Sequence, residues 1–298
     1  MRKKSNYAKK RERREFLWGW GFILPTMLGL CILNIYPIIS TIQKSFYKVG
    51  DFGKGSTFVG LDNYIKVFGD SQVWQALFNT LKYVVMQVPL SIFLSLITAV
   101  LLNQKIKGKS IYRGIFFLPM VTAPAAIAMI WRWIFNSQYG LINNLLHLDV
   151  RWITSPNLTL VTIAIIGIWS VVGYNMVLFL AGLQEIPRDY YEAADIDGAS
   201  EIRKLFSITV PLISPTMFFI SVTSLIGSMQ VFDLIFMIVS KGNPALEKTQ
   251  SLVYLFYKYT FMEKNISYGS TIVVVLLLVI LLITALQMLI QKKWVHYE

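Results

Sequence analysis

The chain has 298 residues, of which 55% are hydrophobic and only 15% charged, and its mean hydropathy is +0.55. Soluble domains carry about 25% charged residues, so this composition indicates a membrane protein. The net charge of +12 does not indicate nucleic-acid binding, because eight of the 28 basic residues fall in the first 14 positions, directly before an apolar run. The single cysteine, Cys31, excludes an internal disulfide, and no Cys/His cluster or HExxH or GxSxG motif supports catalysis.

Six apolar runs are long enough to cross a bilayer as helices, which takes about 20 residues each. The first run follows a basic segment, but it is too long for a signal peptide and no cleavage site follows, so we expect a retained span. A cytoplasmic tail of residues 1–17 is therefore predicted to precede a single all-α transmembrane domain of residues 18–298. The predicted spans lie near 18–41, 79–102, 113–134, 159–183, 213–240 and 268–291.

Lysine and arginine residues are distributed unevenly among the segments that connect these spans. If the N-terminus is inside the cell, the inner segments carry more of them than the outer segments, mostly because of the basic tail. Such a bias favours the cytoplasmic side. We therefore expect both termini, together with the segment 184–212 between the fourth and fifth spans, in the cytoplasm.

Small and polar residues interrupt the fourth and fifth spans. At 100° per residue they form one stripe on each helix, and polar groups at membrane depth are tolerated where they face protein or a water-filled path. An aromatic ring beside hydroxyl groups suits a sugar, and it also suits ordinary helix packing. Asp233 is expected to lie off these stripes. The stripes consist of Gly167, Ser170, Val171, Tyr174 and Leu178 on the fourth span and of Ser221, Ser224, Leu225, Ser228 and Phe232 on the fifth.

The segment 184–212 is acidic and is predicted to fold as two short helices with a sharp bend. Asp189 is expected to cap the first helix together with Glu192 three residues later. Gly198 is expected to end this helix, because glycine adopts the left-handed conformation that terminates helices. The second helix is predicted to begin near Ser200 and to run to the membrane. A plain solvated loop is the alternative interpretation.

The order of residues in this segment closely resembles the EAA signature of permease subunits of ATP-binding-cassette importers. It consists of Glu192-Ala193-Ala194, three residues, Gly198, nine residues, Ile208, one residue and Val210-Pro211, with Val210 where the family usually has leucine. Three further stretches resemble the carbohydrate branch, and with the leading span the chain is similar to the larger permease of maltose-type systems. These stretches are FVGLDNY at 58–64, IWRWIFNSQYGLINNLL at 130–146 and SKGNP at 240–244.

The resemblance implies the six-span type I importer fold in a bacterial plasma membrane, with a coupling loop that docks on a separate ATPase. The implied partners are a second homologous permease subunit, two ATPase subunits, an extracytoplasmic solute-binding protein and membrane lipid, with no nucleic acid. ATP and Mg would bind to the ATPase, so this chain would be no enzyme and would hold no cofactor or metal. The implied ATPase-coupling residues are Glu192, Ala193, Ala194, Asp197 and Gly198. The implied substrate path consists of Ser170, Val171, Tyr174, Leu225, Ser228, Met229 and Phe232.

The predicted function is ATP-driven import of a carbohydrate, with an oligosaccharide as the expected substrate. The same importer class could carry a polyol or glycerol phosphate, but that would require basic groups in the path, and the two stripes contain none. An ion-coupled secondary transporter would need clustered ionisable residues within the spans, whereas Lys82, Arg132 and Asp233 are not clustered. A purely structural membrane anchor would leave the EAA signature unexplained.

Overall fold

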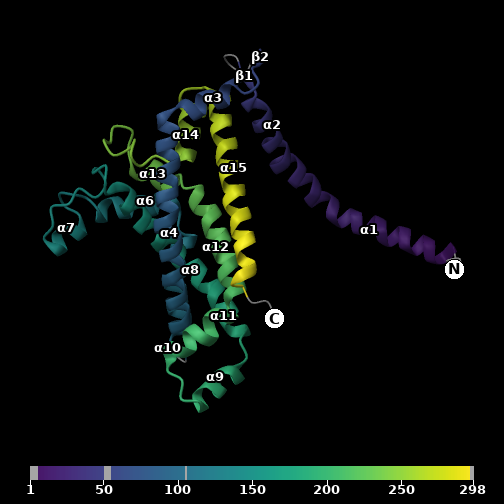
Figure 1. Ribbon diagram of the computed structural model, residues 1–298, viewed down its shortest axis with the longest axis vertical. Helices are drawn as coiled ribbons and strands as arrows, with labels where there is room; N and C mark the ends of the chain where they lie inside the picture. Colours follow the sequence, from purple (N-terminus) through teal and green to yellow (C-terminus); the bar gives the residue numbers. More distant parts are fainter. Residues whose placement is uncertain (1–5, 50–54, 105, 296–298) are drawn as a thin grey trace.

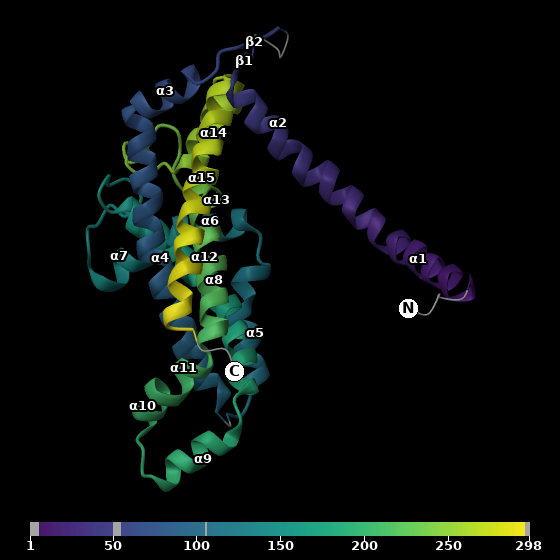
Figure 2. The same ribbon diagram turned by 45° about the vertical axis from the view of Figure 1, so that its right-hand side comes forward.

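The computed structural model describes residues 6–49, 55–104 and 106–295. They form an elongated bundle of helices from which one helix projects (Figures 1 and 2). Residues 1–5 of the predicted tail and residues 296–298 of the predicted domain lie outside these ranges. Among the described residues, four helices are long and apolar enough to cross a membrane: Lys10–Ser45, Ser71–Asn103, Thr159–Glu185 and Ile266–Lys293. Two bent helix pairs raise the number of candidate spans to as many as six.

The projecting helix is built from α1 (Asn6–Leu30), a π-helical turn (Cys31–Ile35) and α2 (Tyr36–Ser45). α1 begins at Asn6, so one helix continues through residue 17, where the boundary between tail and first span was predicted. The described side chains of α1 are exposed along almost its whole length. An apolar helix without intramolecular packing requires lipid or another subunit around it.

A short hairpin follows and corrects the prediction of an all-α chain. The strands β1 (Tyr47–Val49) and β2 (Ser56–Phe58) pair antiparallel, with Tyr47 opposite Phe58. Three residues per strand are too few for the alternation of apolar and polar residues that reveals a strand in a sequence.

The remaining helices contribute the bundle, its two ends and a lateral arm formed by α6 and α7 (Figure 1). In chain order they are α3 (Asp62–Gly69), α4 (Ser71–Asn103), α5 (Lys109–Val121), α6 (Pro124–Ile134), α7 (Leu141–Leu146), α8 (Thr159–Glu185), α9 (Arg188–Ile196), α10 (Glu201–Lys204), α11 (Val210–Leu212), α12 (Ser214–Met229), α13 (Asp233–Ile238), α14 (Leu252–Tyr257) and α15 (Ile266–Ile290). π-helical turns at Leu205–Thr209 and Lys258–Met262 and a 3₁₀ turn at Gln291–Lys293 complete them.

Two predicted spans are bent rather than straight. The third is divided into α5 and α6, which meet at 101°. Pro124 opens α6 and favours extended backbone in the preceding residue Ala123, whose ψ is 133°. At the beginning of the fifth, the helix over Glu201–Leu212, from the predicted coupling segment, meets Ser214–Met229 at 71°. The predicted span 213–240 is also broken, because α12 ends at Met229 and the helical path resumes only with α13.

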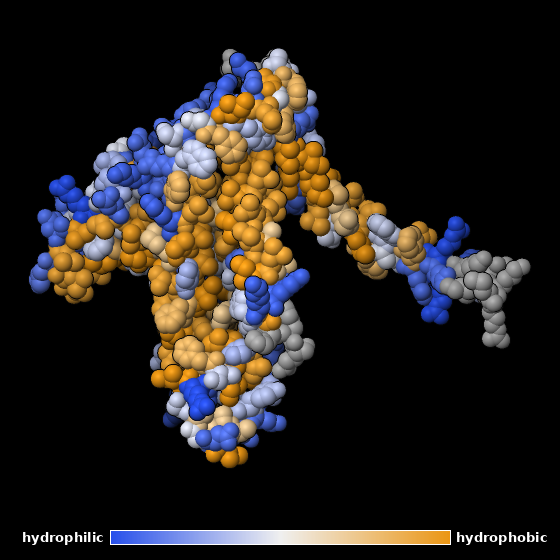
Figure 3. Space-filling view, viewed as in Figure 1, coloured by the Kyte–Doolittle hydropathy of each residue, from blue (hydrophilic) through white to orange (hydrophobic). Residues whose placement is uncertain are grey.

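Close helix packing in the bundle depends on small residues. The Ser95 hydroxyl of α4 donates a hydrogen bond to the carbonyl of Val172 in α8, at 3.1 Å. Gly173 of α8 lies so close to α5 that a methyl group there would overlap the carbonyl oxygen of Phe116. Such close approach is typical of helices packed in membranes. The sides of the bundle are apolar, and hydrophilic residues gather at the end that carries α3 (Figure 3).

Candidate functional site

The predicted coupling segment forms one end of the bundle, opposite the hairpin and α3 (Figures 1 and 2). Its first helix, α9, begins after Pro187, whose extended ψ of 138° interrupts the chain direction of α8. Asp189 lies in the first turn of α9 and not at the cap, and no side chain caps this helix end. The expectation that Asp189 is the capping residue was therefore wrong, although its carboxylate still lies at the positive end of the helix dipole.

The end of α9 has the hydrogen bonds of a Schellman motif. Gly198 has a φ of +70°, its N–H donates to the carbonyl of Asp195 at 3.1 Å, and the N–H of Ala199 donates to the carbonyl of Ala194 at 2.9 Å. Ser200 then caps α10, because its hydroxyl accepts a hydrogen bond from the N–H of Arg203 at 3.4 Å. The predicted bend at Gly198 and the second helix beginning after Ser200 are confirmed.

Lys204 joins the two short helices, a contact that sequence reasoning missed. Its ammonium group donates hydrogen bonds to the carboxylates of Asp195 in α9 and Glu201 in α10, the latter at 2.7 Å. Only 9% of the Lys204 side chain is exposed. The hydrogen bonds to Asp195 and Glu201 raise the pKa of Lys204 above its ordinary value, so the ammonium stays charged at neutral pH. The i,i+3 spacing of Glu201 and Lys204 was the one available signal in the sequence.

A second contact supports the same bend. The hydroxyl groups of Tyr191 in α9 and Thr209 before α11 lie 2.9 Å apart and share a hydrogen bond. Together with the Lys204 ion pairs, this bond holds α9 at a fixed angle to the helices that lead into α12.

The predicted coupling residues lie together on the surface of this end. Glu192, Ala193, Asp197 and Gly198 are exposed and Ala194 is half-buried. None of the salt bridges between described residues involves Glu192 or Asp197. Beside them Ile196, the last residue of α9, is 87% exposed, which is unusual for a large apolar side chain of a monomer. The surface thus combines an apolar tip, small residues and free carboxylates, as a docking surface does.

A cavity of about 350 Å³ lies between α8 and α12 in the interior of the bundle. It includes five of the seven residues of the predicted substrate path, Gly167 and Ser224 from the predicted stripes, and further residues that sequence reasoning missed. The predicted residues at the cavity are Ser170, Val171, Tyr174, Ser228 and Phe232. The additional residues are Tyr83, Gln87, Met120, Gly167, Asn175, Thr223, Ser224, Gly227, Gln230, Val231, Asp233 and Leu234.

The other two predicted path residues do not line this cavity. Leu225 is 7% exposed and Met229 is fully buried, and both pack in a core cluster with α14 and α15. Ser221, from the same stripe, accepts a hydrogen bond from the Gln287 side chain of α15 at 3.2 Å. The fifth-span stripe is therefore divided between the cavity and the α15 contact, because α15 covers part of this face.

The mostly apolar cavity wall carries several hydrogen-bonded polar groups. The Asn175 amide of α8 donates to the Ser224 hydroxyl of α12 at 3.2 Å and so connects the two helices. The hydroxyls of Ser170 and Ser228 donate to carbonyls of their own helices, which leaves their oxygen lone pairs free to accept. The side-chain oxygen of Gln87 is buried and has no hydrogen-bond partner among the described residues. These groups can accept hydrogen bonds from hydroxyls of a ligand.

The break after α12 brings an acid and an aromatic ring to the cavity. Asp233 begins α13 and lines the cavity, so the expectation that it lies off the stripe was wrong. Helical geometry could not place it, because the helix ends at Met229. Phe232 lies 5.2 Å from the ring of Phe236 and 5.1 Å from that of Tyr257. No lysine or arginine of the described chain lines the cavity.

No metal-binding cluster is evident among the described residues. No group of three or more His, Cys, Asp or Glu side chains there could hold a metal ion. That this chain needs no cofactor stays a prediction.

The chain belongs to the family of binding-protein-dependent transport system inner membrane components, whose model matches residues 91–296. This confirms the family to which the EAA pattern pointed. A relative from Bacillus subtilis (strain 168), called probable ABC transporter permease protein YesP, is 34% identical, with 96% of this chain and 94% of the relative covered. The trehalose/maltose permease protein MalF of Thermococcus litoralis is 32% identical (91% and 92% covered). The sn-glycerol-3-phosphate permease protein UgpA of Yersinia enterocolitica is 31% identical (93% and 94% covered).

A solved structure has the same fold. A chain of a bacterial alginate ABC transporter, solved in complex with a periplasmic protein that binds an alginate pentasaccharide, matches with a TM-score of 0.84. The alignment covers 95% of this chain and 96% of that chain, at 21% sequence identity. The likeness shows that this chain has the fold of an ABC transporter membrane subunit.

Proposed function

We propose that this chain is a membrane-spanning subunit of an ATP-driven carbohydrate importer and forms one half of its translocation path. The observation that carries the proposal is the cavity between α8 and α12, whose wall combines hydroxyls and amides with the aromatic rings of Tyr174 and Phe232. Sugars present hydroxyl groups and apolar C–H faces, which such a wall complements. Relatives named for trehalose/maltose and lactose transport support the substrate class.

Coupling to ATP hydrolysis is assigned to the α9–α10 end. The exposed Glu192, the small Ala193 and Ala194 and the bend at Gly198 would dock on a separate ATPase subunit. The proposed complex contains a second permease subunit, a pair of ATPase subunits that bind ATP and Mg, and an extracytoplasmic binding protein. Both termini and α9 would lie in the cytoplasm.

The glycerol phosphate alternative deserves comparison because UgpA proteins are among the relatives. A phosphate-carrying substrate needs positive charge in its path. The cavity contains Asp233 and no lysine or arginine among the described residues. A neutral sugar or oligosaccharide therefore fits this half of the path better than an anion does.

The test is a substrate screen with the assembled complex. Neutral mono- and oligosaccharides and sn-glycerol 3-phosphate are added with the binding protein, and the rate of ATP hydrolysis is measured. We expect stimulation by a neutral glycan. Stimulation by sn-glycerol 3-phosphate alone would overturn the carbohydrate assignment, and a complex without a stimulated ATPase would overturn the importer assignment.

A further inference from the structure

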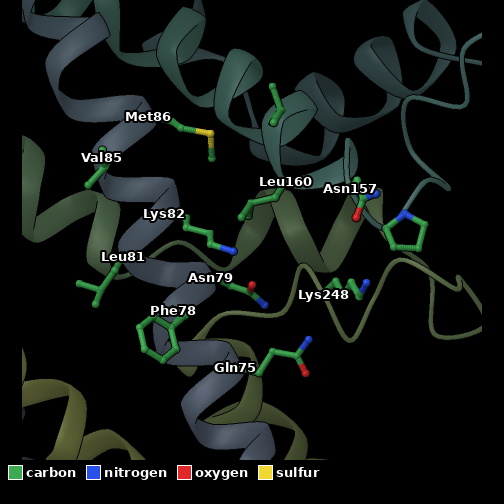
Figure 4. A pocket seen from close by; sticks show the side chains of 12 residues that line it. Gln75, Phe78, Asn79, Leu81, Lys82, Val85, Met86, Asn157, Leu160 and Lys248 are labelled. Carbon is green, nitrogen blue, oxygen red and sulfur yellow. The ribbon is translucent and has the colours of Figure 1, made fainter.

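A larger cavity of about 890 Å³ lies apart from the proposed path, between the first half of α4, the beginning of α8 and the loop before α14 (Figure 4). Its size falls within the roughly 300–1,000 Å³ that is typical of small-molecule sites. One part of its wall is apolar and the other is polar and basic. The argument depends on Phe78, Lys82, Val85, Val161 and Lys248, which all line it.

The basic part of the wall has no counter-charge among the residues that the structure describes. Lys82 is the only charged residue of α4, and Figure 4 shows its side chain extending from α4 into the cavity, with Lys248 on the opposite loop. No carboxylate lines the cavity, and no salt bridge between described residues involves either lysine. Two like charges at one cavity repel each other and favour an anion between them.

Hydrogen bonds from Asn79 hold the loop backbone on either side of Lys248. The side-chain amide of Asn79, which is 5% exposed, donates to the carbonyls of Glu247 at 3.4 Å and Gln250 at 3.1 Å, on either side of Lys248. The hydroxyl of Thr80 accepts from the N–H of Leu252 at 3.2 Å. The loop is therefore held against α4, and both lysines face one space because of the tertiary structure.

The apolar part of the wall continues the outer surface of the bundle. Phe78 is 58% and Val85 70% exposed, and Val161 of α8 is 40% exposed. In Figure 3 the apolar surface of the bundle reaches up to the hydrophilic residues at the α3 end. An exposed apolar surface of this kind on a membrane-spanning helix is covered by acyl chains.

We propose that this cavity binds an anionic phospholipid from the leaflet at the α3 end. Its phosphate lies between Lys82 and Lys248, and its acyl chains lie along Phe78 and Val85. Lysine ammonium groups bind phosphate as point charges, so two of them beside an apolar surface suit such a headgroup with its acyl chains. A lysine that merely extends toward water would explain Lys82 alone. It would not explain why Asn79 holds the loop that carries a second lysine, Lys248, at the same cavity.

The test uses the full-length chain, purified in detergent together with the subunits that accompany it. The sample is titrated with dioleoylphosphatidylglycerol, and native mass spectrometry counts the bound lipids. We expect a tightly bound lipid that the Lys82→Gln/Lys248→Gln variant binds about 30-fold more weakly, because each lysine near anionic lipid contributes about fivefold. The charge-retaining Lys82→Arg/Lys248→Arg variant should bind as the wild type does, and so should the control Lys241→Gln, which lies in the same loop as Lys248 but does not line the cavity.

Four results would overturn the proposal. Unchanged lipid retention in the Gln/Gln variant would show that the lysines do not bind it. Equal retention of dioleoylphosphatidylcholine would show that the negative charge is irrelevant. Displacement of the lipid by inorganic phosphate at the same concentration would indicate a site for a free anion. Loss of binding-protein-stimulated ATP hydrolysis with unchanged lipid retention would assign the lysines to an acidic protein partner.

Discussion

Single residues at the α9–α10 end, at the cavity and in the core contribute in different ways. Gly198 has open space around its Cα, with no atom within 4 Å of an added methyl group, so its φ of +70° is the only reason for glycine there. Tyr174 is half-buried at the cavity. Leu225, which was predicted to line the same path, is buried in the core instead. Substitutions at these positions therefore distinguish backbone, cavity and core effects.

Gly198→Ala should impair coupling through the backbone alone. A non-glycine residue in the left-handed region costs roughly 1–2 kcal/mol, so the Schellman turn should be populated less and α9 should lose its orientation. We expect several-fold lower uptake and stimulated ATP hydrolysis with normal complex assembly. Gly198→Asn is the control, because asparagine tolerates this conformation and should retain most activity. Equal activity of the alanine variant and the wild type would contradict the docking role of this bend.

Tyr174→Ala and Leu225→Ala should fail in different ways. Loss of about 1.4 kcal/mol of aromatic contact at Tyr174 corresponds to about tenfold weaker transport, measured as sugar uptake by a complex with unchanged thermal stability. Truncation of the buried Leu225 should destabilise the protein by roughly 2–5 kcal/mol and lower the yield of assembled complex. If Tyr174→Ala also prevents assembly, its ring serves packing rather than the path.

At the scale of elements, the cavity and the coupling end are connected by the same two helices. α8 carries Ser170 and Tyr174 and ends at Glu185, and only two residues separate it from the beginning of α9. The chain then returns through α10 and α11 into α12, which carries Ser228. Because Lys204 and Tyr191 hold α9 to this return segment, a force on α9 acts on both walls of the cavity.

Lys204→Met should uncouple the two sites while it preserves the buried stem of the side chain. Without the ammonium, Asp195 and Glu201 lose their common partner and α9 should move independently of α10. We expect faster amide hydrogen exchange across α9 and a several-fold loss of transport per ATP hydrolysed. Arg203→Met removes a neighbouring exposed charge from the same helix and should change neither quantity. Unchanged exchange in the Lys204 variant would show that the ion pairs do not hold the helices.

At the scale of the whole molecule, the coupling end and the hairpin end are separated by the full length of the bundle (Figure 2). α2 leaves the hairpin end and continues into α1, which extends away from the other helices. The most apolar part of this long helix has no buried residue. The fold is thus incomplete as a monomer in water. Lipid and neighbouring subunits must cover the apolar sides of the bundle and the projecting helix.

The predicted orientation can be tested with single cysteines. Cys31 is the only native cysteine, so Cys31→Ser provides a background without thiols. In it, Ser200→Cys at the coupling end should react with a membrane-impermeant maleimide only in inside-out vesicles. Gly242→Cys, after α13, should react only in right-side-out vesicles. Reaction of both from the same side would contradict the odd number of membrane crossings that the predicted topology places between them.

Sequence and tertiary structure contributed different parts of this description. Composition and apolar run length determined the membrane class, because a span needs about 20 apolar residues whatever its neighbours are. The EAA signature with Gly198 determined the family and the bend of the coupling end, because both are local properties of the chain. Helical periodicity is valid as long as the helix continues, so it could place Ser170, Val171, Tyr174 and Ser228 at the cavity, whereas Phe232 lies beyond the end of α12.

Only the tertiary structure decided what depends on neighbouring helices. It placed Asp233 at the cavity because α12 ends at Met229, and it buried Leu225 and Met229 because α15 covers that face. It brought Lys204 into contact with Asp195, nine positions away in the sequence. It also placed Lys82 and Lys248 at one cavity, because the hydrogen bonds of Asn79 hold the loop that carries Lys248 against α4. Contacts between distant segments arise from packing, and no periodicity within one segment specifies them.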